Sequence, residues 1–244
     1  MAIDRNSNVF TFGFAIALVI VVGSTLAILV TFLRPYQEKN AMDKKMISIL
    51  GAVNVEANRE NAQELFDQYI TDSYVINARG EIIESDIPAF DIDKKKEYKD
   101  KTIAVEDRIF PVFIADREGE SYYIMTMAGA GLWGPIWGYA AVGRDLSTFY
   151  GVRFEHQGET PGLGSEINSY DKFQKQWEGK KIRNEDGSFH PMLVSKTPAD
   201  PNDLYAVDGI TGGTITSKAL EEMVNRTMAV YTLYFQSLSN ESVE

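Results

Sequence analysis

The chain has 244 residues, of which 44% are hydrophobic and 24% charged, and its formal net charge is -11 at pH 7. It contains no cysteine and only two histidines, which excludes disulfides and thiolate metal sites and nearly excludes a multi-histidine metal site. Because basic residues supply most of the affinity for a phosphate backbone, the acidic balance disfavours nucleic acid, and we expect neither a nucleic-acid partner nor a metal ion.

The first predicted element is a membrane-spanning helix over residues 9–33, a stretch without a charged residue. It is long enough to cross roughly 30 Å of hydrocarbon. A cleaved signal peptide would have a shorter apolar core, and a buried core helix would carry a polar stripe. Lys39, Lys44 and Lys45 after the span favour a cytoplasmic domain, whereas a short tail before one uncleaved span more often sends the C-terminus out. These residues alone leave the orientation open.

The rest of the chain alternates helical and strand patterns. After a predicted break at Pro35, the apolar spacing predicts a helix up to residue 53, and turn residues around Gly80 predict a hairpin over 73–85. The lysine-rich stretch 91–101 is interpreted as a solvated surface. The remaining predicted elements are a helix over 58–70, strands over 108–116, 120–129, 136–143 and 148–157, a short helix over 169–180 and a long C-terminal helix.

Strands in a meander between helices predict an α+β fold, in which helices pack against an antiparallel sheet. The predicted organisation has three parts. They are an N-terminal tail and transmembrane helix (1–34), a helical linker with a peripheral α/β segment (35–100), and a main domain that ends in the C-terminal helix (101–244).

Two glycine-rich stretches are candidates for a binding site. AGAGLWGPIWGYAAV (128–142) combines glycines with Trp133 and Trp137, so it is either a wall for a planar ligand or a strand–turn–strand with packed tryptophans. HQGETPGLGSEI (156–167) is predicted to be an ordered loop, which either binds a ligand or is a plain surface loop. In a ligand-binding loop, Glu159, Thr160 and the loop amides would hydrogen-bond a polar edge of the ligand.

The third stretch, DGITGGTITS (208–217), places two glycines and several hydroxyl residues before the C-terminal helix. Thr216 and Ser217 are good N-cap residues, and free amides ahead of a helix attract anions, phosphate above all. A capped helix after a turn explains the same pattern without a ligand. The stretch lacks the lysine of a Walker loop and the spacing of a dinucleotide fingerprint.

The same stretch resembles the flavinylation motif of proteins in which FMN is joined to threonine through a phosphoester. The motif reads aspartate, two residues, serine or threonine, glycine, a small residue and threonine, here Asp208, Thr211, Gly212, Gly213 and Thr214. Gly213 stands where alanine is commonest, a departure that keeps the position small. GETPGLGSEI and GLWGPIWGYAAV are similar to stretches of the same family, in the same order after a single span. The chain therefore resembles the family of C subunits of the sodium-translocating NADH:ubiquinone oxidoreductases.

The resemblance implies an FMN-binding domain with Thr214 as the covalent acceptor and with no catalytic residue of its own. Asp208 would present the site to a flavin transferase or hold magnesium during the transfer. The other residues that the resemblance places at the cofactor are Thr211, Gly212, Gly213, Ile215, Thr216, Leu132, Trp133, Glu159, Thr160, Gly162 and Leu163. Leu132 and Trp133 would contact the flavin ring, and Thr211 or Thr216 would add hydrogen bonds to the phosphate.

The resemblance also implies a place in a complex. The chain would be an electron-transfer subunit of an NADH:ubiquinone reductase that is not catalytic alone. Its partners would be an FMN-bearing B subunit, iron–sulfur-bearing membrane subunits, the flavin transferase and membrane lipid, and its domain would lie on the periplasmic side of a bacterial inner membrane. Three alternatives remain: the G subunit of the related Rnf complex, a cofactor-free anchored assembly protein, and an anchored hydrolase with Ser217 or Thr214 as nucleophile.

Overall fold

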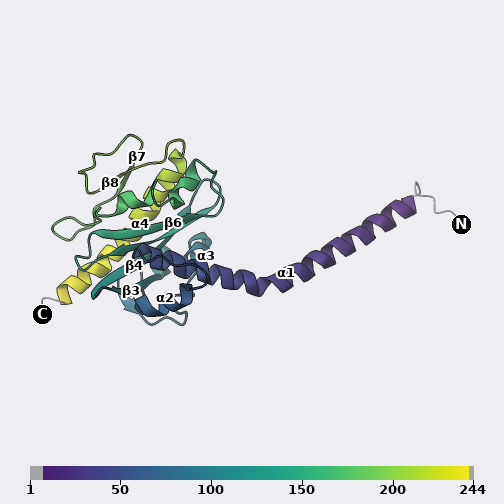
Figure 1. The fold of residues 1–244 in the computed structure, drawn as a ribbon, viewed down its shortest axis with the longest axis horizontal. Helices are drawn as coiled ribbons and strands as arrows, with labels where there is room; N and C mark the ends of the chain where they lie inside the picture. The colour runs from purple at the N-terminus through teal and green to yellow at the C-terminus, as the bar shows by residue number, and fades with distance from the viewer. Residues whose placement is uncertain (1–7, 242–244) are drawn as a thin grey trace. The chain divides into compact units, whose positions relative to one another are not determined.

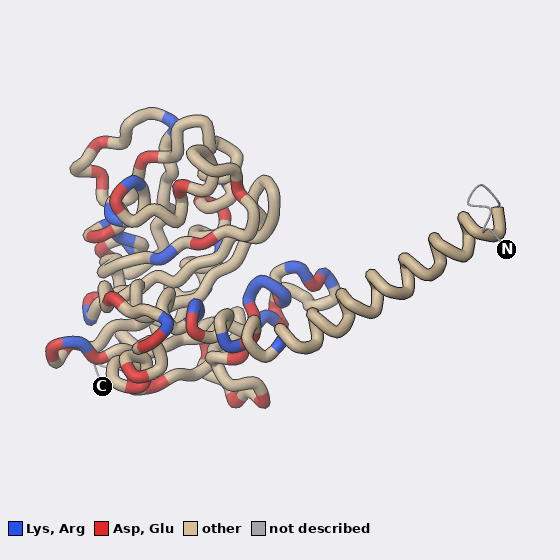
Figure 2. The backbone as a smooth tube through the Cα atoms, turned by 45° about the vertical axis from the view of Figure 1, so that its right-hand side comes forward, with Lys and Arg blue, Asp and Glu red and all other residues tan. Residues whose placement is uncertain are grey.

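The computed structural model describes residues 8–241, and the chain divides into two compact units, Met1–Lys45 and Met46–Glu244. The long helix α1 (Asn8–Ala52) supplies the described part of the first unit (Figure 1). Its apolar part, free of charged residues in Figure 2, is long and apolar enough to cross a membrane, which fits a single-pass membrane protein. The predicted break at Pro35 is wrong, because α1 continues through this residue. A proline inside a helix removes one backbone hydrogen bond, and α1 accommodates that loss here.

The second unit is built on a six-stranded sheet in which every neighbouring pair is antiparallel, in the order β2-β1-β3-β4-β5-β6. Its strands are β1 (Ile70–Ile76), β2 (Ile82–Ile83), β3 (Phe110–Arg117), β4 (Glu120–Ala130), β5 (Pro135–Val142) and β6 (Phe149–His156). The predicted hairpin over 73–85 is confirmed as β1 and β2, and the four predicted strands after it are confirmed with small shifts at their ends. A separate parallel pair, β7 (Leu193–Ser195) and β8 (Ala206–Asp208), had no sequence prediction.

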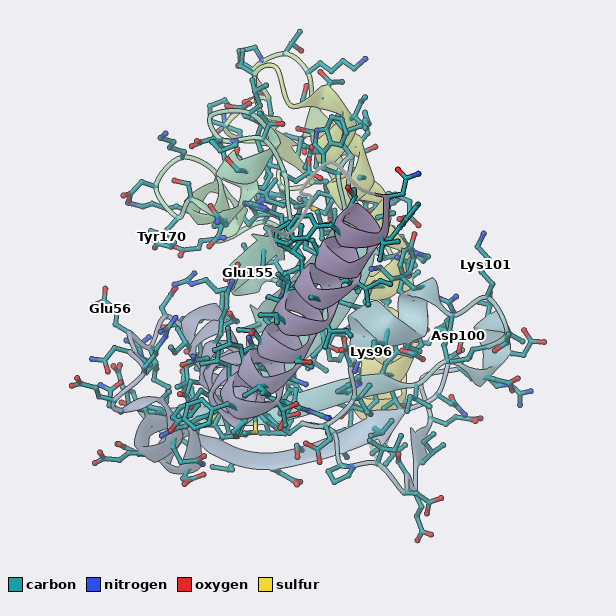
Figure 3. All side chains as sticks on the ribbon, turned by 90° about the vertical axis from the view of Figure 1, so that its right-hand side faces the viewer. Glu56, Lys96, Asp100, Lys101, Glu155 and Tyr170 are labelled. Atoms are coloured by element: carbon teal, nitrogen blue, oxygen red, sulfur yellow. The ribbon has the colours of Figure 1, made fainter. Side chains whose placement is uncertain are left out.

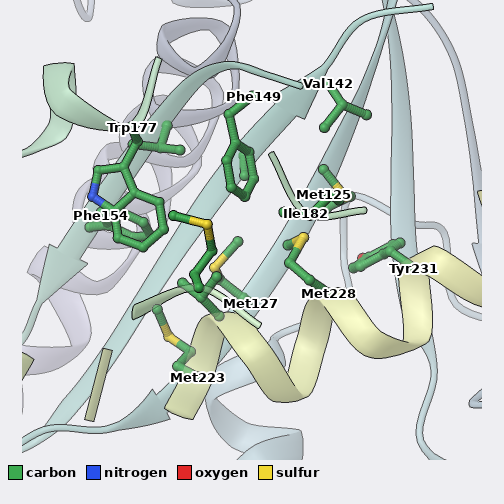
Figure 4. Packing of buried hydrophobic residues seen from close by; sticks show 14 of the residues in the cluster. Met125, Met127, Val142, Phe149, Phe154, Trp177, Ile182, Met223, Met228 and Tyr231 are labelled. Atoms are coloured by element: carbon green, nitrogen blue, oxygen red, sulfur yellow. The ribbon is translucent and has the colours of Figure 1, made fainter. Parts of the chain in front are cut away.

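Helices cover both faces of the sheet, which confirms the α+β prediction. On one face, α4 (Thr214–Glu241) buries Met223, Met228 and Tyr231 against Met125 and Met127 of β4 (Figure 4). The Tyr231 hydroxyl donates to the carbonyl of Pro111 at 2.6 Å and accepts from the amide of Thr126 at 3.1 Å. Burial raises the pKa of the Tyr231 hydroxyl, so it remains a protonated donor in the core.

The other face is covered by the end of α1, with Ile49 and Leu50 fully buried, and by α2 (Ala62–Tyr69). The charge-rich stretch forms α3 (Lys94–Lys99) and is only partly a solvated surface. Lys96 and Lys101, labelled in Figure 3, are exposed, whereas Lys94 packs inward, pairs with Glu97 and donates to the carbonyl of Ile109 at 2.7 Å. Burial lowers the pKa of Lys94 to about 8.

Three short 3-10 helices complete the unit, η1 (Val105–Asp107), η2 (Gly164–Asn168) and η3 (Gln174–Trp177). The predicted helix over 169–180 is reduced to η3. Trp177 at its end is fully buried and lies edge-on to Phe149, Phe154 and Phe173. Packing of the Trp177 indole holds this segment against the sheet, although the segment does not form a full α-helix.

Replacing Gly80 in the β1–β2 turn with alanine should destabilise the protein more than the same replacement of Gly119. Its φ is +78°, and an added Cβ would lie 2.4 Å from the backbone nitrogen of Tyr234. Gly119 has φ +81° but open space around it. Gly119→Ala should therefore cost about 1 kcal/mol of unfolding free energy from left-handed strain alone. Gly80→Ala should cost about 2 kcal/mol more, because helix α4 must shift.

Urea unfolding of both variants measures the difference. Equal losses of stability would mean that α4 yields to the extra methyl group without cost.

Candidate functional site

The third glycine-rich stretch forms a tight turn that leads directly into α4. The amide of Gly213 donates to the carbonyl of Ile210 at 2.9 Å, and the amide of Ser217 donates to the carbonyl of Gly213 at 2.9 Å. Gly213 therefore occupies the N-cap position, and α4 begins at Thr214. The predicted N-cap at Thr216 and Ser217 is wrong by up to four residues, because glycine leaves the turn free to close earlier. Ser217 instead uses its hydroxyl to accept from the amide of Ile210 at 2.9 Å.

Thr214 is the first residue of α4, and its side chain is exposed. The amides of Thr214, Ile215 and Thr216 lie in the first turn, where an α-helix offers them no carbonyl partner. These amides and the aligned peptide dipoles give the end of α4 a partial positive charge. Gly212, with φ +75°, turns the chain just before this point. An exposed hydroxyl thus stands beside a site that favours an anion.

A buried carboxylate, Glu159, connects the three glycine-rich stretches. Only 4% of Glu159 is exposed. One of its oxygens accepts from the amide of Trp133 at 2.9 Å, and the other accepts from the hydroxyl of Thr216 at 2.6 Å. Its own amide donates to Nδ1 of His156 at 3.2 Å. These hydrogen bonds fix the loop before β5, the loop after β6 and the first turn of α4 relative to one another.

Two glycines make this close approach possible. A Cβ on Gly131 would lie 2.5 Å from a carboxylate oxygen of Glu159, and a Cβ on Gly164 would lie 2.4 Å from the hydroxyl of Thr216. A side chain at either position would displace the hydrogen bonds of Glu159. The backbone of Gly164 also approaches Gly213, where an added Cβ would lie 3.3 Å from the Gly164 nitrogen.

Large apolar side chains from all three stretches are exposed near this junction. The exposed fraction is 48% for Leu132, 67% for Trp133, 42% for Leu163 and 60% for Ile215. Leu163 lies over Gly212, since a Cβ there would be 2.6 Å from Cδ2 of Leu163. Exposed apolar groups gathered at one place favour a ligand or partner with an apolar face.

Trp133 and Trp137 do not form a common wall. Trp133 lies in the turn before β5, whereas Trp137 lies on β5, half-buried in the cluster on the α1 side of the sheet, with the ammonium of Lys95 4.2 Å from its ring centroid. Leu132 and Trp133, the two residues of that stretch that were predicted to contact the ring, are both exposed.

The remaining predicted residues lie around the same junction, but not all of them are available to a ligand. Thr160, Gly162 and Thr211 are exposed, and Gly162 has φ +74°. Thr216 is buried and donates to Glu159, so its hydroxyl faces away from the exposed Thr214 side. Asp208 accepts from the amide of Ala199 at 2.7 Å and thereby holds the loop after β7.

Several residues that shape the site carry no signal in the sequence. Gln176 exchanges two hydrogen bonds with the backbone of Asp208, at 2.7 and 2.9 Å, and no motif points to it. Gly131 and Gly164 lie in stretches that were singled out, but their contacts with Glu159 and Thr216 depend on the fold. Lys196 and Lys218 line a cavity next to Thr214 and were also not predicted.

Comparison with known proteins places this geometry in a family. Residues 131–229, which contain all three stretches from Gly131 onward, match the model of the FMN-binding domain. The chain is 30% identical over 239 residues to the C subunit of Na(+)-translocating NADH-quinone reductase from Vibrio parahaemolyticus, covering 91% of this chain and 90% of that protein. It is 29% identical over 234 residues to the C subunit from Vibrio alginolyticus, with the same coverage.

Two solved structures are also similar. A crystal structure of the C subunit of Na(+)-translocating NADH-quinone reductase from Parabacteroides distasonis superposes with a TM-score of 0.72 at 39% identity, over 83% of this chain and 96% of that one. Shewanella oneidensis NqrC, at 24% identity and a TM-score of 0.66, shares the fold. The resemblance found in the sequence is therefore confirmed, and the chain belongs to the family of the C subunits of Na(+)-translocating NADH-quinone reductases.

Proposed function

We propose that this chain carries FMN as a phosphoester on Thr214 and relays electrons within a Na(+)-translocating NADH-quinone reductase. The observation that supports this most is the position of Thr214. Its exposed hydroxyl stands at the start of α4, beside first-turn amides without helical partners and next to exposed apolar side chains. A phosphate and an adjoining planar ring system are the two groups that such a junction suits.

The residues present fit FMN in three respects. Gly212 leaves an exposed backbone next to the acceptor, and the first-turn amides of Ile215 and Thr216 would donate to phosphate oxygens. Leu132, Trp133 and Leu163 would cover part of the ring. FMN, when bound, supplies the redox chemistry, while the protein sets its position and exposure. No acid, base or nucleophile of this chain is required once the ester has formed.

Glu159 would act on the cofactor through position and charge. It holds the Trp133 loop and the first turn of α4 by two hydrogen bonds. Since its carboxylate is buried, its charge is weakly screened. A negative charge near the flavin should disfavour anionic reduced forms and lower the reduction potential, unless backbone donors offset it. Thr160 and Gly162 would border the ring edge from the same loop.

The assembly that we propose follows from the family. The helix α1 anchors the chain in the membrane, and other subunits of the reductase, including an FMN-bearing B subunit and iron–sulfur-bearing subunits, would exchange electrons with it. A flavin transferase would attach the cofactor during maturation, with Asp208 presenting the site. We place the domain on the periplasmic side of the bacterial inner membrane, and the three lysines after the apolar stretch argue mildly against that orientation.

A hydrolytic role for Thr214 or Ser217 has less support. A nucleophilic hydroxyl needs a base within hydrogen-bond reach. Among residues 8–241, Nδ1 of His156 accepts from the amide of Glu159, the ring of His190 stacks on Tyr205, and neither histidine is hydrogen-bonded to these hydroxyls. The hydroxyl of Ser217 is occupied by the amide of Ile210.

Colour that survives denaturation separates the flavin proposal from a cofactor-free assembly protein. The full chain, purified in detergent from a host with a flavin transferase, should be yellow and should keep its flavin absorbance after acid precipitation and washing. A colourless pellet with flavin in the supernatant would mean non-covalent binding. A colourless protein throughout would favour the assembly role.

A further inference from the structure

A cavity lies beside Thr214. Its volume is about 150 Å³, and its walls come from the end of β7, the turn 209–212 and the first turns of α4. Thr214 borders it, whereas Leu132, Trp133 and Leu163 do not. The lining also includes Val194 and Ile210, so the cavity has both polar and apolar walls.

The charged residues that line this cavity within the described chain are both cations, Lys196 and Lys218. Lys218 lies four residues after Thr214, so both side chains are on one face of α4. Lys196 approaches from the opposite wall, is exposed, and has no ion pair in the part of the chain that the structure describes.

Lys218 is held in place by an acid that is not part of the cavity lining. Both carboxylate oxygens of Glu221 lie 2.8 Å from Nζ of Lys218. Glu221 is itself fixed, because one of its oxygens accepts from the amide of Val194 at 2.6 Å. An ammonium group has three donors, so this pairing leaves Lys218 one donor for a ligand in the cavity.

The cavity suits a single anionic group. Pockets that enclose a whole drug-sized ligand usually measure about 300–1,000 Å³, so this one has room for a phosphate, and a nucleoside attached to that phosphate would extend outside it. Lys196 would supply a positive charge to a phosphate, and Lys218 would supply its remaining N–H donor, because Glu221 already offsets the charge of Lys218. The backbone at Gly209 packs tightly under the cavity, since a Cβ there would lie 2.6 Å from the carbonyl oxygen of Ser195.

We propose that Lys196 and Lys218 bind the departing phosphate of a flavin dinucleotide while the flavin transferase loads Thr214, an inference that rests on the proposed covalent attachment. In this transfer the Oγ of Thr214 forms a bond to the phosphorus next to the flavin. The anhydride P–O bond breaks, and its electron pair leaves with the nucleoside monophosphate. The threonine proton passes to a base of the transferase. No electron is gained or lost.

The two lysines would accelerate loading without being needed to retain the product. Negative charge builds on the departing phosphate as the anhydride breaks, and preorganised cations next to it stabilise that charge. After transfer the phosphoester on Thr214 holds the cofactor covalently, whatever occupies the cavity. Removing a lysine should therefore slow attachment and leave the final occupancy unchanged.

The test is a time course of flavin attachment. The full chain in detergent, expressed without transferase, is mixed with purified transferase and flavin adenine dinucleotide, and the mass increase is followed. Lys196→Gln and Lys218→Gln should each lower the initial rate about tenfold, with a larger loss in the double variant, while all three reach the wild-type end point. Lys218→Arg should restore most of the rate, because it keeps the charge.

The matched control is the double variant Lys96→Gln/Lys101→Gln. It removes the same charge from the α3 region, labelled in Figure 3, and should react at the wild-type rate. A control slowed as much as the cavity variants would mean that overall charge sets the encounter with the transferase, which would overturn the proposal.

Two further outcomes separate this inference from the proposed function. If the cavity variants react at the wild-type rate while Thr214→Ala stays unmodified, the lysine proposal fails and the covalent attachment stands. If wild-type chain itself gains no mass although the transferase modifies a known substrate, both proposals fail together.

Discussion

A Thr214→Ala variant should contain no covalently attached flavin and should keep the wild-type fold. The side chain of Thr214 is exposed and starts a helix, so its loss removes the acceptor oxygen without opening a cavity. Alanine is favourable within a helix, and we expect the free energy of unfolding to change by less than about 1 kcal/mol. Flavin absorbance of the denatured, washed protein measures the attachment, and circular dichroism during urea unfolding measures the stability.

A further variant provides a control for this result. Thr214→Ser keeps a hydroxyl at the same position and should be loaded. Full flavin incorporation into Thr214→Ala would move the acceptor to another residue and would contradict the role of Thr214.

Replacing Glu159 with alanine should have the largest effect on the organisation of the site. The substitution removes charge-assisted hydrogen bonds to the amide of Trp133 and the hydroxyl of Thr216, each worth about 1.5–3 kcal/mol. It also leaves the Thr216 hydroxyl buried without its acceptor. We expect the free energy of unfolding to fall by about 3 kcal/mol and the attached flavin to gain mobility, measured by urea unfolding and by flavin fluorescence anisotropy.

The same loop offers a matched control in Glu166, which pairs with Lys172 at 2.8 Å near the surface. Glu166→Ala should cost less than about 1 kcal/mol, because exposed ion pairs contribute little. A double-mutant cycle of Glu159→Ala with Thr216→Val should give a coupling energy of about 1–3 kcal/mol. A coupling near zero, or equal losses for the two glutamates, would mean that Glu159 does not hold α4 to its loop.

The antiparallel sheet was predictable because its strands carry a strong local signal. β4 and β5 alternate side chains between two buried faces, and glycine turns such as that at Gly80 separate neighbouring strands. Helix ends were less predictable. The continuation of α1 through Pro35 and the early start of α4 at Thr214 both depend on how the chain closes locally, which residue type alone does not determine.

The three stretches that form the candidate site were predictable from the sequence, but their positions relative to one another were not. Resemblance to the flavinylation motif singled out Thr214, and the glycine-rich stretches singled out Trp133 and Glu159 separately. The hydrogen bonds of Glu159 that join the stretches cross 26 and 57 positions of sequence. The same limit applies to Gln176, which reaches the site where η3 lies against Asp208 of β8. It also applies to Lys196, which follows β7 where that strand pairs with β8. Long-range contacts of this kind leave no periodic pattern in a single sequence.

Peptide mass spectrometry of the full chain from a host with a flavin transferase is the most direct test of a phosphoester on Thr214. Tryptic cleavage yields a peptide that ends at Lys218 and contains Thr214. This peptide should gain the mass of FMN less one water, with fragment ions that localise the addition to Thr214. An unmodified peptide from a host whose transferase loads another substrate would contradict it, and the turn before α4 would then be only a helix cap.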